Sequence, residues 1–346
     1  MILKDNIEFG VVPEETAAHP GTRLPGEPFD TYALRLYENA KEYGLTCEGI
    51  GAVLNAITGE NKTESAWRKY YTAFRKGIEY ATNYDEALVK TRILALSDFH
   101  FPFQKPIETF APYKGKIDLL VLNGDLLDCQ SISKFLKTYR INPMQEIIGA
   151  RQYFIDLIDY IHPKKVVVTY GNHELRLGTY MAKTVDNELQ ELVPMTALDY
   201  IFDDGIPHYD RQTRAKTFYE PIRDYFEDIE IEYCGNWWYQ LGENGAIFCH
   251  PKAYSSSIMK TTEKAVGWFR NSGIVFPTLV MAHTHRIGSY KLGNTMIYEQ
   301  GCLCETKKMA YADGMLVNEQ KEGFLYLCLD ENGKPVEKAT KLITLN

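Results

Sequence analysis

Acidic residues, histidines and one asparagine stand at the ends of several short apolar runs in the sequence. They are Asp98 and His100, Asp125 and Asp128, Asn172 and His173, His250, and His283 with His285. Carboxylate, imidazole and amide oxygen together suit Mn²⁺, Fe or Zn²⁺ better than Ca²⁺ or a purely structural zinc. A lone histidine at a strand end is more often structural. Five such segments in series therefore indicate a metal centre.

The apolar runs themselves predict how these side chains are positioned. ILALSDFH, DLLVLNGD and KVVVTYGNH are typical of buried strands in an α/β sheet, with the polar residues at their carboxyl ends. A helix is expected between them at 144–161. A pair such as Asp98/His100 or His283/His285 aims both side chains the same way if it lies on extended backbone.

Further strands are expected in the second half of the chain. IEIEYCGNWWYQL and AIFCHP, joined by the turn residues 242–245, predict a hairpin. A helix should follow at 256–270, then strands at TLVM and TMIYEQ. The run 322–330 is expected to be a last edge strand.

The motifs D-x-H, G-D-x-x-D, G-N-H-E, H and A-H-T-H occur in this order between Asp98 and His285. This series resembles that of the calcineurin-like metallophosphoesterases over about 91–305. The visible departure is Ala282, where the last motif of the family has glycine. The resemblance implies an α/β fold, with two mixed β-sheets packed face to face and helices outside.

The resemblance also implies a ligand set for two divalent ions. Asp98, His100 and His285 would hold the first ion, Asn172, His250 and His283 the second, and Asp125 would bridge both. Mn²⁺ is expected, with Fe or Zn²⁺ as alternatives. A hydroxide bridging the two ions would be the nucleophile that attacks a phosphoester.

Other side chains near these ligands are expected to support the reaction. His173 would act as general acid or as a donor to the phosphate, beside the catalytic bridging Asp125. Asp128 either orients a neighbouring group or caps a helix in SISKFLKTY. Arg176 either contacts the substrate phosphate or, as we slightly favour, pairs with Glu174.

The substrate class is less closely specified by these motifs. Cys129 and Gln130 stand where serine/threonine protein phosphatases of the superfamily carry Arg-Gly, which argues against that class. The motif series is distantly similar to that of Mre11/SbcD-type DNA nucleases, but we do not expect their capping domain here. Tyr254, Trp237 and Trp238 could stack on bases. Of the two tryptophans, at least one is expected to be core.

The chain should have three parts: an extended arm at 1–29, a helical, helix-turn-helix-like module at 30–88, and a phosphoesterase domain at 89–346. Within the module, helices are expected from Asp30 to Tyr43, from Thr46 to Gly59, and from Ser65 onward. Small helical modules on this kind of enzyme are reminiscent of phage and prophage proteins.

The third of these helices is basic. Lys62 to Lys76 holds five basic residues and one acidic residue, a charge of +4 in a chain of −8. Arg68, Lys69, Arg75 and Lys76 are expected to face outward and bind DNA, or else to be a solvated face. The inner face would consist largely of Trp67, Tyr70, Tyr71, Phe74 and Ile78.

Three functions follow as hypotheses. The first is a metal-dependent DNA phosphodiesterase, a nuclease. The second is a phosphatase or phosphodiesterase of small molecules such as nucleotides, with the helical module used for assembly. The third is a DNA-binding protein whose metal site is inactive, which the full ligand set disfavours.

Composition predicts a soluble, cytoplasmic protein. The apolar fraction of 45% and the charged fraction of 24% are those of ordinary globular domains. There is no signal-peptide pattern and no apolar run near the roughly 20 residues of a membrane span. The seven cysteines form no CxxC pair, so free thiols are expected.

Overall fold

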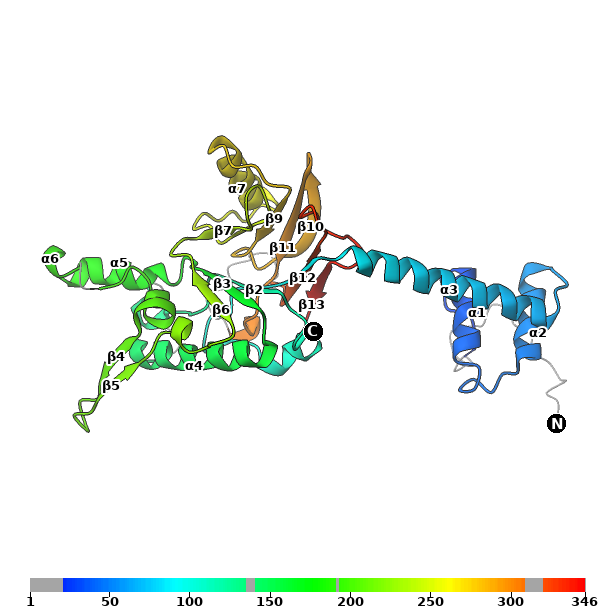
Figure 1. The fold of residues 1–346 in the computed structure, drawn as a ribbon, viewed down its shortest axis with the longest axis horizontal. Helices are drawn as coiled ribbons and strands as arrows, with labels where there is room; N and C mark the ends of the chain where they lie inside the picture. The colour runs from blue at the N-terminus through cyan, green and yellow to red at the C-terminus, as the bar shows by residue number, and fades with distance from the viewer. Residues whose placement is uncertain (1–20, 135–140, 191–192, 309–319, 346) are drawn as a thin grey trace. The chain divides into compact units, whose positions relative to one another are not determined.

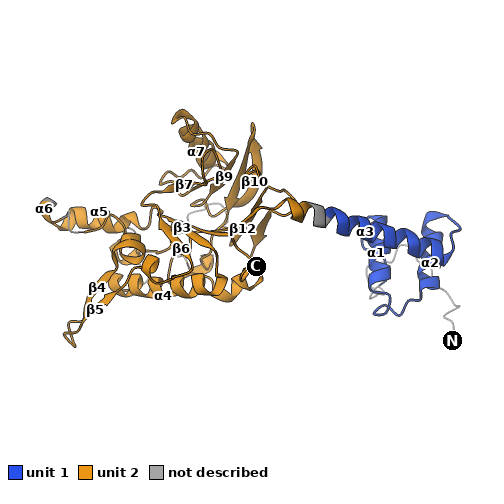
Figure 2. Cartoon of the chain, viewed as in Figure 1, with its two compact units in different colours: residues 1–84 blue, residues 85–346 orange. Residues whose placement is uncertain are grey.

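The computed structural model describes residues 21–134, 141–190, 193–308 and 320–345 (Figure 1). The chain divides into two compact units, residues 1–84 and 85–346 (Figure 2). We call them the N-terminal unit and the C-terminal unit. In the described residues, no helix has the length and apolar character needed to cross a membrane. All seven cysteines are free.

The N-terminal unit is built from helices α1 (Phe29–Glu38) and α2 (Cys47–Thr58) and from most of α3 (Glu64–Leu88), which runs past the boundary. Its core includes the buried side chains of Leu36, Leu54, Trp67 and Tyr71. The Thr46 hydroxyl accepts a hydrogen bond from the Gly49 N–H at 3.0 Å, which caps α2 as expected. Helix α1 ends at Glu38, earlier than the expected Tyr43.

Two details of this unit differ from expectation. Of the five residues assigned to the inner face of α3, Tyr70 and Ile78 are 49% and 44% exposed. Part of the expected arm is also anchored, because the Glu27 carboxylate pairs with Arg35 of α1 at 2.8 Å. Residues 1–20 of the arm lie outside the described residues.

The C-terminal unit contains two mixed sheets and a small hairpin. Its strands are β1 (Thr91–Leu96), β2 (Leu119–Asn123), β3 (Lys165–Thr169), β4 (Ile206–Tyr209), β5 (Lys216–Tyr219), β6 (Glu230–Tyr233), β7 (Trp238–Gln240), β8 (Ile247–Cys249), β9 (Thr278–Met281), β10 (Ile287–Leu292), β11 (Thr295–Gln300), β12 (Gly323–Leu329) and β13 (Lys341–Thr344). One sheet has the order β13-β12-β1-β2-β3-β6 and the other β10-β11-β9-β8-β7, while β4 pairs with β5.

The helices of this unit lie outside the sheets or in the connections. They are α4 (Pro143–Ile161), α5 (Leu175–Thr184), α6 (Asn187–Gln190), α7 (Lys260–Asn271), the short 3₁₀ turns η1 (Ile107–Tyr113), η2 (Gln130–Ile132), η4 (Ile222–Asp224) and η5 (Thr306–Lys308), and the π-helical η3 (Asp199–Asp204). Helix α4 packs on the first sheet and α7 on the second.

The space between the two sheets is filled by apolar side chains from both. Val121 of β2 and Leu325 of β12 belong to the same buried cluster as Phe248 of β8 and Val280 of β9. Strands β2, β8 and β9 are buried along their whole length, and their residues are nearly all apolar. The expected α/β architecture of two packed mixed sheets with outer helices is confirmed.

Two expectations about strand partners were wrong. The stretch IEIEYC is not in the hairpin, because β6 pairs parallel with β3 in the first sheet, and only β7 pairs with β8. Strand β12 is not an edge strand, since it lies between β13 and β1. Periodicity within a strand does not specify which neighbour it pairs with.

Candidate metal centre

The expected ligands follow strands whose carboxyl ends meet. Strands β1, β2 and β3 are parallel neighbours in one sheet, and β8 and β9 are parallel neighbours in the other. The Asn123 side chain at the end of β2 lies 3.4 Å from the carbonyl oxygen of Cys249 at the end of β8. Both sheet ends therefore deliver their polar residues to one place.

The backbone at these positions is not extended, contrary to expectation. Asp98, His100, Asp125, His283 and His285 all have positive φ angles, between 46° and 73°. Non-glycine residues adopt this left-handed region at a cost, and they do so often at functional sites. The paired side chains of each D-x-H or H-x-H segment are therefore aimed by tight turns beyond the strand ends.

The three residues of the expected first ligand set converge. His285 Nε2 lies 3.0 Å from Asp98 Oδ1 and 3.2 Å from His100 Nε2. All three side chains are buried. We call this group the first position.

The expected second set, Asn172, His250 and His283, lies beside Asp125, and we call it the second position. Asp125, His250 and His283 place ligand atoms within 4.8 Å of one another. Asn172 Oδ1 and His283 Nε2 are buried without a hydrogen-bond partner. Buried polar atoms without partners are rare in folded proteins. Amide oxygen and imidazole nitrogen both bind divalent metals, so the residues fit an ion at this position.

Asp125 lies between the two positions. Its Oδ2 is 3.2 Å from His250 Nε2 and 4.0 Å from His100 Nε2. A Cβ atom on Gly171 would stand 2.2 Å from Asp125 Oδ1, which explains why glycine precedes Asn172. The location of Asp125 is that of a carboxylate able to serve both positions.

The charges of the cluster depend on one another. Burial alone would raise the pKa of Asp98, but the imidazoles of His250 and His285 lower it to about 2. Burial alone would lower the pKa of His250, but the carboxylates of Asp125 and Asp98 raise it to about 9. Burial and the nearby His250 lower the pKa of His283 to about 3. A cluster of mixed charge in a buried site is the environment that divalent cations occupy.

Comparison with known families agrees with this geometry. Residues 91–287, more than half of the chain, match the family of calcineurin-like phosphoesterases. The chain belongs to this family. It is a metal-dependent phosphoesterase, and its buried His/Asp clusters are consistent with a site for two metal ions.

The N-terminal unit of the phosphoesterase is similar to a different family. Residues 20–85 match a family described as the YonJ N-terminal domain. Over 58 residues, the chain is 38% identical to the SPbeta prophage-derived uncharacterized protein YonJ of Bacillus subtilis strain 168. That alignment covers 17% of the phosphoesterase and 14% of the Bacillus protein, so the two share a short segment.

Among solved structures, the phosphoesterase is similar to vacuolar protein sorting 29 from Cryptosporidium parvum, with 13% identity and a TM-score of 0.37 over 75% of this chain and 99% of the other. A structure described as a novel archaeal phosphodiesterase has 13% identity and a TM-score of 0.33, covering 73% of this chain and 99% of the other.

His173 of the phosphoesterase lies against the first position. Its Nδ1 is 2.9 Å from the Asp128 carbonyl oxygen and 3.2 Å from Asp128 Oδ1, and its Nε2 is 2.8 Å from Arg176 Nη2. Asp128 thus fixes the ring of His173, as in the orienting role considered from sequence. The capping role is not seen in the short turn η2, where Cys129 is at the N-cap; residues 135–140 of the expected helix lie outside the described residues.

The favoured ion pair between Arg176 and Glu174 is replaced by other contacts. The buried Glu174 carboxylate accepts hydrogen bonds from the N–H groups of Gly171, Asp125 and Leu127, at 2.7, 3.1 and 3.0 Å. Glu174 therefore holds the two ligand-bearing turns together. Arg176 instead donates a hydrogen bond to the Asp128 carbonyl oxygen.

The remaining substrate candidates fall in two places. Tyr254 lies beside the second position, with its ring 5.8 Å from that of His283, and is 47% exposed. Arg68, Lys69, Arg75 and Lys76 are exposed on α3 in the N-terminal unit. Arg68 pairs with Glu64 and Arg75 with Glu79, so part of this charge is locally compensated.

Two features near the metal centre were missed from sequence. Cys304 lies with His100 and His285 in a group of possible metal ligands. A cavity of about 420 Å³ adjoins the second position, lined in part by Trp268 and Lys264 of α7. The Cys-x-Cys spacing at 302–304 was a visible signal for the first feature, but those cysteines resembled ordinary core residues. Residues of α7 gave no sign that they face the site.

Proposed function

We propose that this phosphoesterase cleaves the phosphodiester bonds of DNA, with one base held in the cavity beside the second position. The proposal rests on this cavity, because its walls contain side chains beside the expected metal and side chains that could hold a base. Asn172 and His250 line one part of it, next to the expected metal, and aromatic and lysine side chains line the rest.

The aromatic part of the cavity is built by packing between two elements. Trp237 precedes β7, and its ring centre lies 5.1 Å from that of Trp268 on α7. Trp237 is partly buried and packs against the core cluster beneath α7, whereas Trp268 is 47% exposed. An exposed indole in contact with a partly buried indole offers a face on which any base can stack.

The charged part of the cavity suits a phosphodiester backbone. Lys252 and Lys264 line it, and both are exposed. Lysines beside stacking aromatics are the usual elements of sites for single-stranded nucleic acid. We therefore expect single-stranded or frayed DNA to be preferred over intact duplex.

The residues of the chain would share the work of hydrolysis as follows. Asp98, His100, His285 and Asp125 would hold one divalent ion, and Asn172, His250, His283 and Asp125 the other. Two such ions supply charge neutralisation at the phosphate and a water of lowered pKa as nucleophile. His173 is held through Nδ1 by Asp128, and its Nε2 accepts a hydrogen bond from Arg176, so it would have to leave Arg176 and take up a proton before it could donate one from Nε2 to the leaving oxygen.

The test is cleavage of single-stranded, duplex and nicked DNA with added Mn²⁺ or Zn²⁺, alongside bis-p-nitrophenyl phosphate and p-nitrophenyl phosphate. We expect DNA and the diester to be cleaved, and single strands fastest. Hydrolysis of the small diester without any DNA cleavage would contradict the proposal and favour a small-molecule phosphodiesterase.

The cavity itself is tested by Trp268→Ala. Loss of one stacking partner costs roughly 1–3 kcal/mol, or about 5–150-fold in kcat/KM for single-stranded DNA. Hydrolysis of bis-p-nitrophenyl phosphate should stay near the wild-type rate. The matched control is Tyr209→Ala, which removes an aromatic side chain of similar exposure from β4. An equal loss of kcat/KM on both substrates, or a similar loss in the control variant, would contradict a role for the cavity in binding DNA.

A further inference from the structure

The segment that follows β11 places Cys304 beside the first position. Residues 302–305 run beside residues 97–105, which carry Asp98 and His100. The Leu303 N–H donates to the Asp98 carbonyl oxygen at 3.1 Å, and the Glu305 N–H donates to the Phe103 carbonyl oxygen at 2.8 Å. These backbone contacts on both sides fix Cys304 between them.

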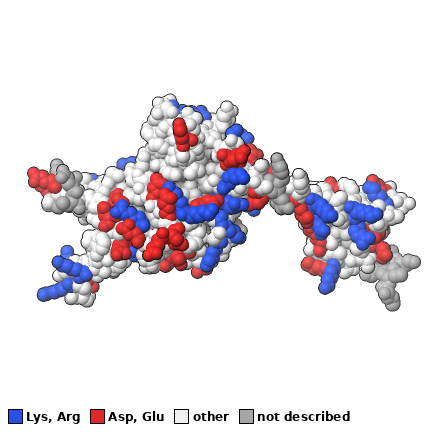
Figure 3. Space-filling model, viewed as in Figure 1, with Lys and Arg blue, Asp and Glu red and all other residues white. Residues whose placement is uncertain are grey.

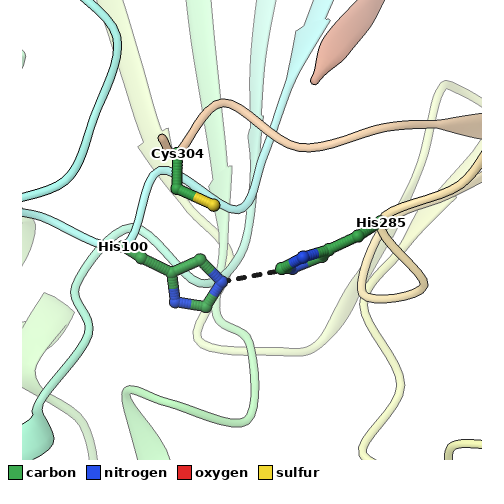
Figure 4. A group of neighbouring side chains, drawn as sticks. All are labelled: His100, His285 and Cys304. Carbon is green, nitrogen blue, oxygen red and sulfur yellow. Dashed lines mark hydrogen bonds between the residues drawn. The ribbon is translucent and has the colours of Figure 1, made fainter. Parts of the chain in front are cut away.

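The thiol of Cys304 faces two of the expected ligands. Its Sγ and the ligand nitrogens of His100 and His285 all lie within 4.8 Å of one another. Figure 4 shows the Cys304 side chain beside the line that joins the two imidazole rings. Nitrogen and sulfur ligands lie about 2.1 and 2.3 Å from a zinc ion, so two of them around one ion are up to about 4.4 Å apart. The separations in this group, all below 4.8 Å, are therefore compatible with one ion between the three ligand atoms after a small side-chain adjustment.

Ordinary packing accounts poorly for this buried cysteine. A buried free cysteine usually acts as a small apolar residue inside a hydrophobic core. Among the described residues, Cys302 and Cys304 form a separate small cluster whose partly buried apolar neighbour is Phe103. Cys304 is fully buried, yet on one side it meets imidazoles instead of apolar side chains.

We propose that Cys304 is an additional ligand of the metal at the first position, through its thiolate. This inference rests on the two-ion centre of the proposed function and adds a ligand to it. Thiolate is a soft ligand that favours Zn²⁺ or iron over Mn²⁺. The first position should therefore select a softer ion than the Mn²⁺ expected from the other ligands.

Cys302 is the alternative thiol and provides the matched control. It also contacts His285, but its Sγ donates to the Lys321 carbonyl oxygen at 3.4 Å, and it is not in a ligand group with both imidazoles. Changing Cys302 to serine alters the same small cluster without removing the proposed ligand. The two variants thus separate ligation from packing.

The test is a titration of the metal-free protein, with both units present, with CoCl₂, followed by absorption spectroscopy. We expect a near-ultraviolet sulfur-to-cobalt charge-transfer band in the wild type and in Cys302→Ser, and none in Cys304→Ser. Competition with a chromophoric chelator should show Zn²⁺ affinity at the first position reduced by at least about tenfold in Cys304→Ser, with Mn²⁺ affinity changed less.

Three outcomes would overturn the inference. Bound cobalt without the band in the wild type leaves the metal centre intact and excludes a thiolate ligand. A band lost in Cys302→Ser but kept in Cys304→Ser assigns the ligand to Cys302. Absence of any cobalt binding rejects the metal centre itself. If Cys304→Ser fails to fold, zinc-edge X-ray absorption of the wild type decides, because a sulfur ligand at about 2.3 Å is required.

Discussion

At the scale of single residues, the centre depends on short side chains held in unfavourable backbone conformations. Asp98 and Asp125 have positive φ angles, and each accepts a backbone N–H hydrogen bond, from His283 at 3.2 Å and from His173 at 2.8 Å respectively. The hydrogen bonds offset part of the backbone strain and leave the other carboxylate oxygen free to face the ligand positions. Substituting Asp98 or Asp125 would therefore disturb the backbone geometry of the centre as well as its charge.

Substitution of His173 distinguishes a role in proton transfer from a role in metal binding. His173→Ala should reduce kcat by roughly 10²–10⁴-fold, because it removes the expected proton donor, while both metals stay bound. Turnover of bis-p-nitrophenyl phosphate and metal content by mass spectrometry would measure the two effects. His162→Ala, at an exposed position after α4, is the control. Because His173 also groups with His100 and Asp125, loss of a metal would make it a ligand instead.

At the scale of elements, the site is held by contacts between helices and the turns after strands. Glu146 in the first turn of α4 accepts a hydrogen bond from the Cys129 N–H at 2.6 Å, just beyond the G-D-x-x-D motif. Glu174 likewise accepts backbone N–H hydrogen bonds from the turns after β2 and β3. Two buried glutamates thus connect the ligand-bearing turns to the helical layer and to each other.

Glu146 should make stability depend on pH. Burial raises the pKa of its carboxyl from 4.5 to about 8. Between these values the folded protein keeps a proton that the unfolded chain has lost, so rising pH favours unfolding. Glu146→Gln keeps a hydrogen-bond acceptor for the Cys129 N–H. It should abolish the Glu146 contribution to the loss of folding stability with rising pH, which is up to a few kcal/mol. Urea unfolding of the metal-free protein at about pH 5.5 and about pH 8.5 measures it.

The matched control for this prediction is Glu331→Gln, at an exposed turn of the same unit. It should lose as much stability between the two pH values as the wild type does. If Glu146→Gln behaves like this control, the Glu146 carboxyl is ionised in the folded protein and the predicted linkage is absent.

At the scale of the whole molecule, charge is distributed unevenly. The chain carries −8 overall, yet Lys62 to Lys76 carries +4. Lysine and arginine side chains are visible over the N-terminal unit, interspersed with acidic ones (Figure 3). Arg68 and Arg75 are 59% and 52% exposed, and ion pairs made by such exposed side chains contribute little to stability, so these arginines remain available to phosphates.

Replacing Arg68, Lys69, Arg75 and Lys76 together with glutamine should weaken DNA binding at low salt. The salt dependence of the affinity should also become shallower, by roughly 0.7–0.9 in the logarithmic slope for each DNA phosphate that the variant no longer neutralises. Fluorescence anisotropy with labelled DNA measures both, and hydrolysis of bis-p-nitrophenyl phosphate should stay unchanged.

Four exposed lysines of the C-terminal unit, Lys116, Lys164, Lys334 and Lys341, provide a control with the same change of net charge. If both variants weaken binding equally, the effect comes from total charge and the N-terminal unit has no specific part in DNA binding.

Much of the centre could be predicted because its ligands are local features of the sequence. Asp98, His100 and Asp125 each follow an apolar run directly, and the ends of parallel strands must meet at one sheet edge. The same reasoning failed for β6 and β12, because apolar periodicity marks a strand without identifying its neighbours. It also failed for the extended backbone expected at Asp98 and His100, since a turn conformation leaves no mark in side-chain type.

The sequence by itself determined the family, the phosphoester chemistry and the ligand types, since these depend on residue identity and order. Only the tertiary structure showed that Cys304 approaches His100 and His285, and that Trp268 and Lys264 line a cavity beside His250. These residues lie outside the motifs whose side chains they approach. Their approach results from sheet pairing and helix packing, which depend on the whole fold and not on any local pattern.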